Sequence, residues 1–145
     1  KSATSPNTDA DREVHQFTYS LYPHAGTWKE GMVVPMAYNL NCPMYTKVEE
    51  PHDGALADEL SLISIDKENV IIEVIKKAED GEDFIIRMYE CHNKRSKVTC
   101  TVFKNIDAVA ECDLMERNLS EMKHENRSFE FEIKPYEIKT FRLKL

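Results

Sequence analysis

The stretch NVIIEVIKKAEDGEDFIIRMYE, from Asn69 to Glu90, consists of two apolar runs separated by a short polar one. Val70 to Lys76 and Phe84 to Glu90 are rich in Val, Ile, Phe and Tyr, which are residue types favoured in β-strands. The acidic run between them contains Gly81, which can adopt the positive φ that tight turns require. The stretch therefore predicts a long antiparallel β-hairpin.

Side chains of a strand point alternately to its two faces, so the sequence also predicts what each face carries. In the first run one face carries Val70, Ile72 and Val74, and the other carries Ile71, Glu73 and Ile75. In the second run one face carries Phe84, Ile86 and Met88, and the other carries Ile85, Arg87 and Tyr89. Because both faces of the first run are largely apolar, we expect it to be a central strand covered on both sides.

Composition limits the classes of protein to consider. With 145 residues the chain fits one domain with a sizeable core. The net charge is -7 and the acidic residues are dispersed, which argues against nucleic acid as a partner. No apolar run reaches the roughly 18–20 residues of a membrane span, so we expect a soluble protein. The four cysteines form no CxxC pair and lie in or beside apolar segments, which predicts reduced, partly buried thiols.

Outside the hairpin the chain is punctuated by further short strand patterns. Alternation predicts a half-buried strand over Val14 to Tyr22, a short irregular helix over Trp28 to Leu40 and a strand over Met44 to Val48. Further strands are predicted from Leu60 to Ile65, from Val98 to Phe103, from Ala108 to Leu114, from Phe129 to Ile133 and from Pro135 to Leu145. Closely spaced strands with little helix predict an all-β fold, an antiparallel β-sandwich with one short irregular helical segment.

Three sequence blocks resemble one known family. The segment HQFTYSLYPHAGTW, from His15 to Trp28, resembles a signature near the start of the C-terminal β-region of class II α-mannosidases, glycoside hydrolase family 38. The hairpin resembles a second block of that family, through KKAED from Lys76 and RMYE from Arg87. PYEIKTF, from Pro135, resembles its closing block. The likeness is to the cytosolic and bacterial branch, which implies a cytoplasmic location.

The resemblance implies a domain organisation and an activity. Residues 1–13 are expected to be a flexible lead-in from a missing N-terminal region, and residues 14–145 to be the C-terminal β-sandwich domain. Family members are retaining glycosidases that remove terminal α-linked mannose with an aspartate nucleophile, a carboxyl acid/base and a zinc ion, all in their N-terminal catalytic region. We therefore expect zinc in that missing domain, no cofactor in this chain, and this chain's own catalytic domain and a mannose-containing oligosaccharide as partners.

No residue of this chain is predicted to be catalytic or to bind a metal. The acids from Glu79 to Asp83 are expected to be solvated turn residues, and the five histidines are spread without metal-ligand spacing. We expect His24 to order a turn by hydrogen bonding. Trp28 and Tyr22 are expected to pack in the core, although aromatic rings of this kind can also stack on a sugar.

Arg87 is the candidate substrate-binding residue, because it is a charged residue in a strongly apolar strand. One interpretation is an ion pair with Glu79, Asp80 or Glu90, since an unpaired buried charge is costly. The other is that it reaches an interdomain cleft and completes the substrate pocket, because ligand sites favour domain interfaces.

Two alternatives for the whole chain remain. A carbohydrate-binding module would require an exposed aromatic platform and affinity for sugar without the enzyme. A structural or oligomerisation module would expose a large apolar patch and form homo-oligomers.

Overall fold

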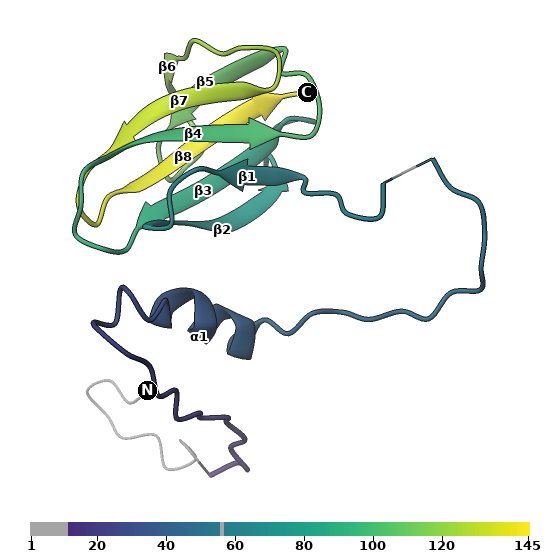
Figure 1. Ribbon diagram of the computed structural model, residues 1–145. Helices are drawn as coiled ribbons and strands as arrows, with labels where there is room; N and C mark the ends of the chain where they lie inside the picture. The colour runs from purple at the N-terminus through teal and green to yellow at the C-terminus, as the bar shows by residue number, and fades with distance from the viewer. Residues whose placement is uncertain (1–11, 56) are drawn as a thin grey trace. The chain divides into compact units, whose positions relative to one another are not determined.

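The computed structural model describes residues 12–55 and 57–145, and almost all of their regular structure lies after residue 62 (Figure 1). One helix, α1 (Val33–Asn41), precedes eight strands. The strands are β1 (Ile63–Ile65), β2 (Val70–Lys77), β3 (Phe84–Glu90), β4 (Ser96–Val102), β5 (Ala108–Cys112), β6 (Asn118–Glu121), β7 (Ser128–Ile133) and β8 (Ile138–Lys144).

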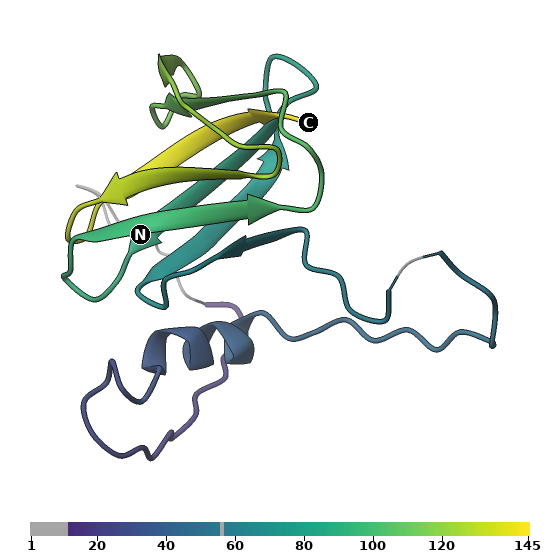
Figure 2. The same ribbon diagram turned by 45° about the horizontal axis from the view of Figure 1, so that its top comes forward.

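The strands form two antiparallel sheets that stack as two layers (Figures 1 and 2). Sheet A has the strand order β1-β4-β7, and sheet B has the order β2-β3-β8-β5-β6. Every neighbouring pair is antiparallel. The predicted all-β sandwich is confirmed.

The predicted hairpin is confirmed, but the predicted position of its first strand is wrong. Strands β2 and β3 pair from Val70 opposite Glu90 to Lys77 opposite Phe84. However, β2 is the edge strand of sheet B, and a bulge between Ile72 and Val74 shifts the register. The bulge inserts one extra residue into β2, which reverses the faces of all later residues.

As a result, the predicted grouping of Val74 with Val70 and Ile72 fails. Val74 lies opposite Arg87, and Ile75 lies opposite Ile86 with half of its surface exposed. The strand that is covered on both faces is β3, where the adjacent residues Ile85 and Ile86 are both fully buried.

The core is centred on three phenylalanines contributed by both sheets. The ring centroid of Phe141 in β8 lies 5.0 Å from that of Phe129 and 4.7 Å from that of Phe131, both in β7. Leu143 is fully buried in the same cluster and Leu145 packs against it, as the alternation of the last strand predicted. Aromatic contacts of this kind add to the burial of apolar area and join the two sheets.

The described residues that precede the sandwich differ most from expectation. The predicted strands over Val14 to Tyr22 and Met44 to Val48 are wrong, because neither segment pairs with another described segment and both are exposed. A helix is present but starts later than predicted, at Val33, so that Pro35 falls in its first turn, where proline removes no helical hydrogen bond. The chain divides between Val33 and Val34 into two compact units.

The thiols of the sandwich are free, as predicted. Cys91, Cys100 and Cys112 are buried, whereas Cys42 is exposed. Within residues 12–55 and 57–145, no helix is long and apolar enough to cross a membrane.

Replacing Phe141 by Ala should remove the aromatic contact between the sheets and leave a cavity. We expect the free energy of unfolding to fall by about 3–5 kcal/mol, measured by urea denaturation. The control is Phe103→Ala, because Phe103 is 44% exposed and its truncation should cost less than about 1 kcal/mol. Similar losses for the two variants would contradict this account of the core.

Candidate functional site

Arg87 lies on the outer face of sheet B, which points away from sheet A. Its neighbours in β3, Ile86 and Met88, belong to the core cluster, so the alternation of the strand directs Arg87 to the opposite face. The Arg87 Nε donates a hydrogen bond to Thr140 Oγ1 at 3.1 Å, and Nη2 donates to the carbonyl oxygen of Leu114 at 3.1 Å. The guanidinium therefore ties β3 to β8 and to the loop after β5.

The predicted ion pair of Arg87 with Glu79, Asp80 or Glu90 is wrong, because these carboxylates have other partners. Glu79 pairs with Lys76, and Asp80 pairs with Arg142. Glu90 lies in the same strand as Arg87 but on the opposite face of β3, and its partners are described below. Sequence reasoning identified Arg87 as a residue that needs polar partners but assigned those partners incorrectly.

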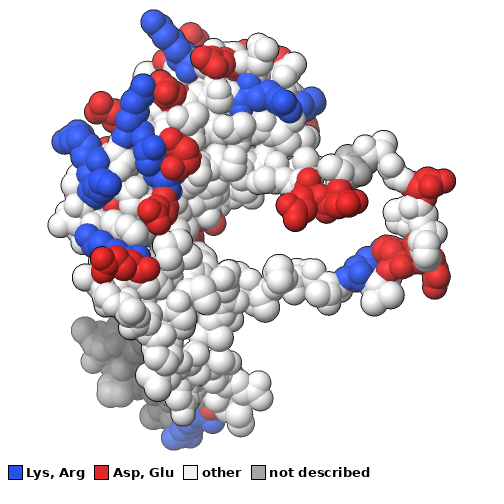
Figure 3. Space-filling view, in the orientation of Figure 1, with Lys and Arg blue, Asp and Glu red and all other residues white. Residues whose placement is uncertain are grey.

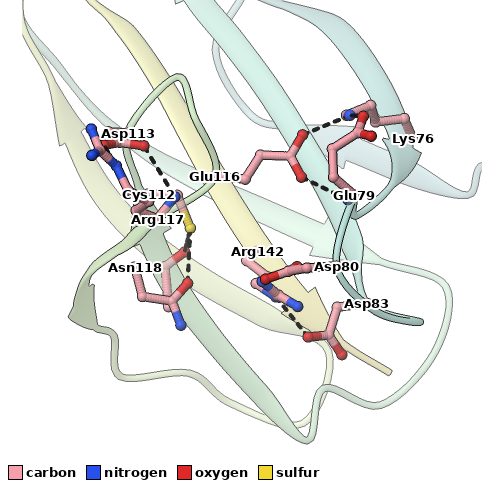
Figure 4. Close-up of polar contacts among 11 residues, drawn as sticks. Lys76, Glu79, Asp80, Asp83, Cys112, Asp113, Glu116, Arg117, Asn118 and Arg142 are labelled. Carbon is pink, nitrogen blue, oxygen red and sulfur yellow. Dashed lines mark hydrogen bonds and ion pairs between the residues drawn. The ribbon is translucent and has the colours of Figure 1, made fainter.

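Ion pairs on this face form a group that we call the outer-face cluster (Figure 4). Its members are Lys76, Glu79, Asp80, Asp83, Glu116 and Arg142. Across the face of the sandwich visible in Figure 3, acidic and basic side chains are interspersed. The cluster joins the β2–β3 turn, strand β8 and the β5–β6 loop.

Arg142 occupies one half of the outer-face cluster. Its Nη1 lies 2.8 Å from Asp80 Oδ1, and its Nε lies 2.7 Å from Asp83 Oδ2. The bond to Asp83, followed by that to Asp80, raises the pKa of the guanidinium. Arg142 has a side chain only 16% exposed, so these contacts are better shielded from water than an ordinary surface ion pair.

Glu116 occupies the other half, and sequence reasoning missed it. Its carboxylate lies 2.6 Å from Lys76 Nζ and accepts a hydrogen bond from the backbone N–H of Glu79 at 2.9 Å. These bonds, that of Lys76 first, lower the pKa of Glu116. Its φ of 63° is in the left-handed region, where a non-glycine residue is strained, and Asp113 holds this turn by accepting from the N–H groups of Met115 and Arg117.

A second polar group lies inside the sandwich, at the end of β3. Glu90 is 1% exposed, and its Oε1 accepts hydrogen bonds from Asn69 Nδ2 at 2.8 Å and from the His92 N–H at 2.7 Å. Its Oε2 accepts from the Tyr136 N–H at 3.0 Å. Burial opposes ionisation, but these hydrogen bonds outweigh it and lower the pKa of the carboxyl.

The carboxylates of these two groups take part in ion pairs and hydrogen bonds within the sandwich. The acids of the outer-face cluster are paired with cations, and no group of three or more His, Cys, Asp or Glu among the described residues could hold a metal ion. The residues present therefore do not fit a zinc site. The side chains of Glu79 and Glu82 are 80% and 90% exposed, as predicted for a solvated turn. Asp83 differs, because its carboxylate forms an ion pair with Arg142.

Two shallow hollows, of about 320 and 280 Å³, flank Arg142 on the outer face. The first is lined by residues of β5, β6 and β8, and the second by the β2–β3 turn and the β5–β6 loop. No Trp, Tyr or Phe lines either hollow, so neither offers an aromatic platform for a sugar ring.

The remaining sequence candidates lie in the segment before Val33. The predicted core packing of Trp28 and Tyr22 is wrong, because they are 42% and 44% exposed. His24 hydrogen-bonds through Nδ1 to the carbonyl oxygen of Ala25 at 3.2 Å, in agreement with its predicted role in a turn.

Residues 69–141 match the family model described as "Glycosyl hydrolases family 38 C-terminal beta sandwich domain". The chain belongs to this family. The match begins at Asn69 and ends at Phe141, so it contains the Glu90 hydrogen-bond network, Arg87 and the whole outer-face cluster except Arg142. The resemblance that the three sequence blocks suggested is confirmed.

This family 38 domain is similar to parts of much longer proteins. It is 36% identical to Alpha-mannosidase G of Dictyostelium discoideum over 98% of this chain and 13% of that protein. It is 32% identical to Alpha-mannosidase 2C1 of Homo sapiens over 81% of this chain and 11% of that protein. It is 26% identical to Alpha-mannosidase of Saccharomyces cerevisiae over 99% of this chain and 15% of that protein. The chain thus spans well under a fifth of each of these relatives.

Replacing Glu90 by Gln puts a neutral amide in place of the carboxylate that accepts hydrogen bonds from Asn69, His92 and Tyr136. We expect the free energy of unfolding to fall by about 2–4 kcal/mol at neutral pH. Because the folded-state pKa of Glu90 lies below its ordinary value of 4.5, the contribution is complete above that pH and is lost as the pH falls through the folded-state pKa. Urea unfolding measured from neutral to acidic pH should therefore show the two proteins converging in acid.

The control for this prediction is Glu82→Gln, since the side chain of Glu82 is 90% exposed. This variant should unfold like the parent protein at neutral pH. An unchanged free energy of unfolding for Glu90→Gln at neutral pH would contradict the proposed role of the buried carboxylate.

Replacing Arg142 by Met should release the β2–β3 turn, because Asp80 and Asp83 lose their shared partner. We expect a loss of about 1–3 kcal/mol in the free energy of unfolding and faster hydrogen exchange of the amides of residues 79–83. The control is Arg117→Met, which removes an arginine that is 77% exposed and pairs with Asp113. If both variants left the exchange of the turn unchanged, the cluster would not hold it.

Proposed function

We propose that this chain is the C-terminal domain of an α-mannosidase that hydrolyses terminal, non-reducing α-D-mannose residues. The observation that carries the proposal is the match of residues 69–141 to the family 38 C-terminal sandwich, together with relatives named α-mannosidase that align with nearly the whole chain. On this proposal the chain supports the catalytic domain and does not hydrolyse glycosides alone.

The proposal includes the properties that the family resemblance implies for the complete enzyme. These are a retaining mechanism, a zinc ion or another divalent metal in the N-terminal catalytic domain, a cytoplasmic location, and a mannose-containing oligosaccharide as substrate. Residues 1–13 would be the lead-in from that domain, and the first eleven lie outside the described residues. Self-association of the complete enzyme is compatible with this arrangement.

Within this chain, Arg87 is the proposed contact with the substrate. An arginine has five N–H donors, and the bonds to Thr140 and Leu114 leave donors for a sugar hydroxyl. This contact requires the loop of residues 113–117 to face the catalytic domain. In the other role Arg87 only fixes that loop against β8, and the two roles predict different kinetics.

The proposed function is tested by assaying this chain and the full-length protein with an aryl α-mannoside. We expect turnover by the full-length protein and none by the isolated chain. Metal analysis should find zinc in the full-length protein, and calorimetric titration of the isolated chain with mannose or mannobiose should give no heat of binding. Turnover or one equivalent of zinc in the isolated chain would contradict the proposal, and sugar affinity would favour a carbohydrate-binding module.

The role of Arg87 is tested in the same full-length protein. If Arg87 contacts the substrate, Arg87→Met should raise KM with little change in the melting temperature. Thr140→Val is the matched control, because it removes the structural partner of Arg87 Nε without removing the cation. A lowered melting temperature with an unchanged KM for Arg87→Met would assign the residue a structural role.

A further inference from the structure

Residues 14–22 form an apolar strand pattern that has no partner in the part of the chain described. Alternate residues are apolar, and the exposed fractions are 82% for Phe17, 86% for Tyr19 and 92% for Leu21. The segment pairs with none of the described strands. Large apolar side chains left this exposed along one face typically mark a surface that a partner covers.

Two aromatic side chains of the segment lie beside each other. The rings of Phe17 and Tyr19, two residues apart, lie with their centroids 6.3 Å apart, as expected for side chains on the same face of an extended chain. The other face is polar in the middle of the segment, at Gln16, Thr18 and Ser20, and carries Val14 and Tyr22 at its ends. One face would therefore enter a core while the other faced water or a polar surface.

A hydrogen-bonded turn follows this segment a few residues later, at residues 26–31. The carboxylate of Glu30 accepts hydrogen bonds from the Thr27 N–H at 2.7 Å and from Thr27 Oγ1 at 2.9 Å. The N–H of Gly31 donates to the carbonyl oxygen of Thr27 at 2.9 Å, and Gly26 takes the positive φ of 71° that glycine tolerates. The strand pattern is thus followed by a defined turn.

The comparisons place the segment outside the sandwich module but inside the longer enzymes. The family model begins at residue 69, more than forty residues after the segment ends. The Dictyostelium discoideum and Saccharomyces cerevisiae relatives nevertheless align with 98% and 99% of this chain, which includes residues 14–22. The segment therefore aligns with longer proteins named α-mannosidase but lies outside the residues that match the C-terminal sandwich model.

We propose that residues 14–22 form a β-strand that adds to a sheet edge of the mannosidase polypeptide outside this chain, with Phe17, Tyr19 and Leu21 entering that region's core. This inference rests on the proposed function for the identity of the partner. Backbone hydrogen bonds of the added strand give the pairing its stability, and the alternating side chains set its register. The segment would then anchor the sandwich to the rest of the enzyme.

Hydrogen exchange of the full-length protein, compared with this chain, tests the proposal. We expect amides of residues 14–22 to exchange at least about 100-fold more slowly in the full-length protein, because each paired N–H requires local opening. In the isolated chain the same amides should exchange at the rate of an unstructured peptide.

Matched variants in the full-length protein distinguish the two faces. Phe17→Asp should abolish the protection of residues 14–22, whereas Thr18→Asp, on the polar face, should preserve it. Free exchange of the segment in an active full-length mannosidase would overturn the strand proposal alone. Protection without mannosidase activity would overturn the proposed function while supporting the strand. Protection in the isolated chain that grows with its concentration would overturn the proposal by identifying a second copy as the partner.

Discussion

The sandwich depends on satisfying one buried negative charge. Glu90 ends β3 inside the protein, and a carboxylate in that position is tolerated only when hydrogen-bond donors replace the lost water. Those donors come from Asn69 before β2, His92 after β3 and Tyr136 before β8. Three connections must therefore reach their final positions together, which couples the ends of the neighbouring strands β2, β3 and β8 of sheet B.

Asn69 extends this coupling to the other sheet. Its Nδ2 also lies 3.1 Å from the Ser96 Oγ at the start of β4, and the Ser96 hydroxyl can donate to Asn69 Oδ1. The polar network thus bridges the two layers at one end, while the three phenylalanines bridge them in the middle. On the outer face of sheet B, Arg142 and Glu116 play a different part, because they fix loops rather than layers.

The sequence predicted the features that depend on local pattern. Strand β3, the hairpin and the buried face of β8 follow from alternation and turn residues, which act within a few positions. The bulge at Glu73 could not be predicted, because an inserted residue leaves no mark in an already apolar run. The ion pairs of Arg142 and Glu116 join residues far apart in the chain, so their partners depend on the completed sheet order rather than on spacing.

Residues 14–22 show the opposite failure, in which a sound local pattern does not form the expected structure. A strand requires a neighbouring strand to satisfy its backbone, and alternation carries no information about whether that neighbour lies in the same chain. Pattern alone therefore predicted a strand that the described part of the chain does not form. Similarly, the sequence indicated that Arg87 needs a polar partner, but only its register with β8 identified Thr140 as that partner.

The buried thiols have a practical consequence for studying this domain. Cys100 is fully buried in β4, and burial raises the pKa of its thiol to about 12. Since the thiolate is the nucleophile in alkylation, this cysteine is protected both by lack of access and by lack of ionisation. The rate at which Cys100 is alkylated therefore reports how often the two layers separate. The alkylation rate of exposed Cys42 in the same sample serves as the internal reference.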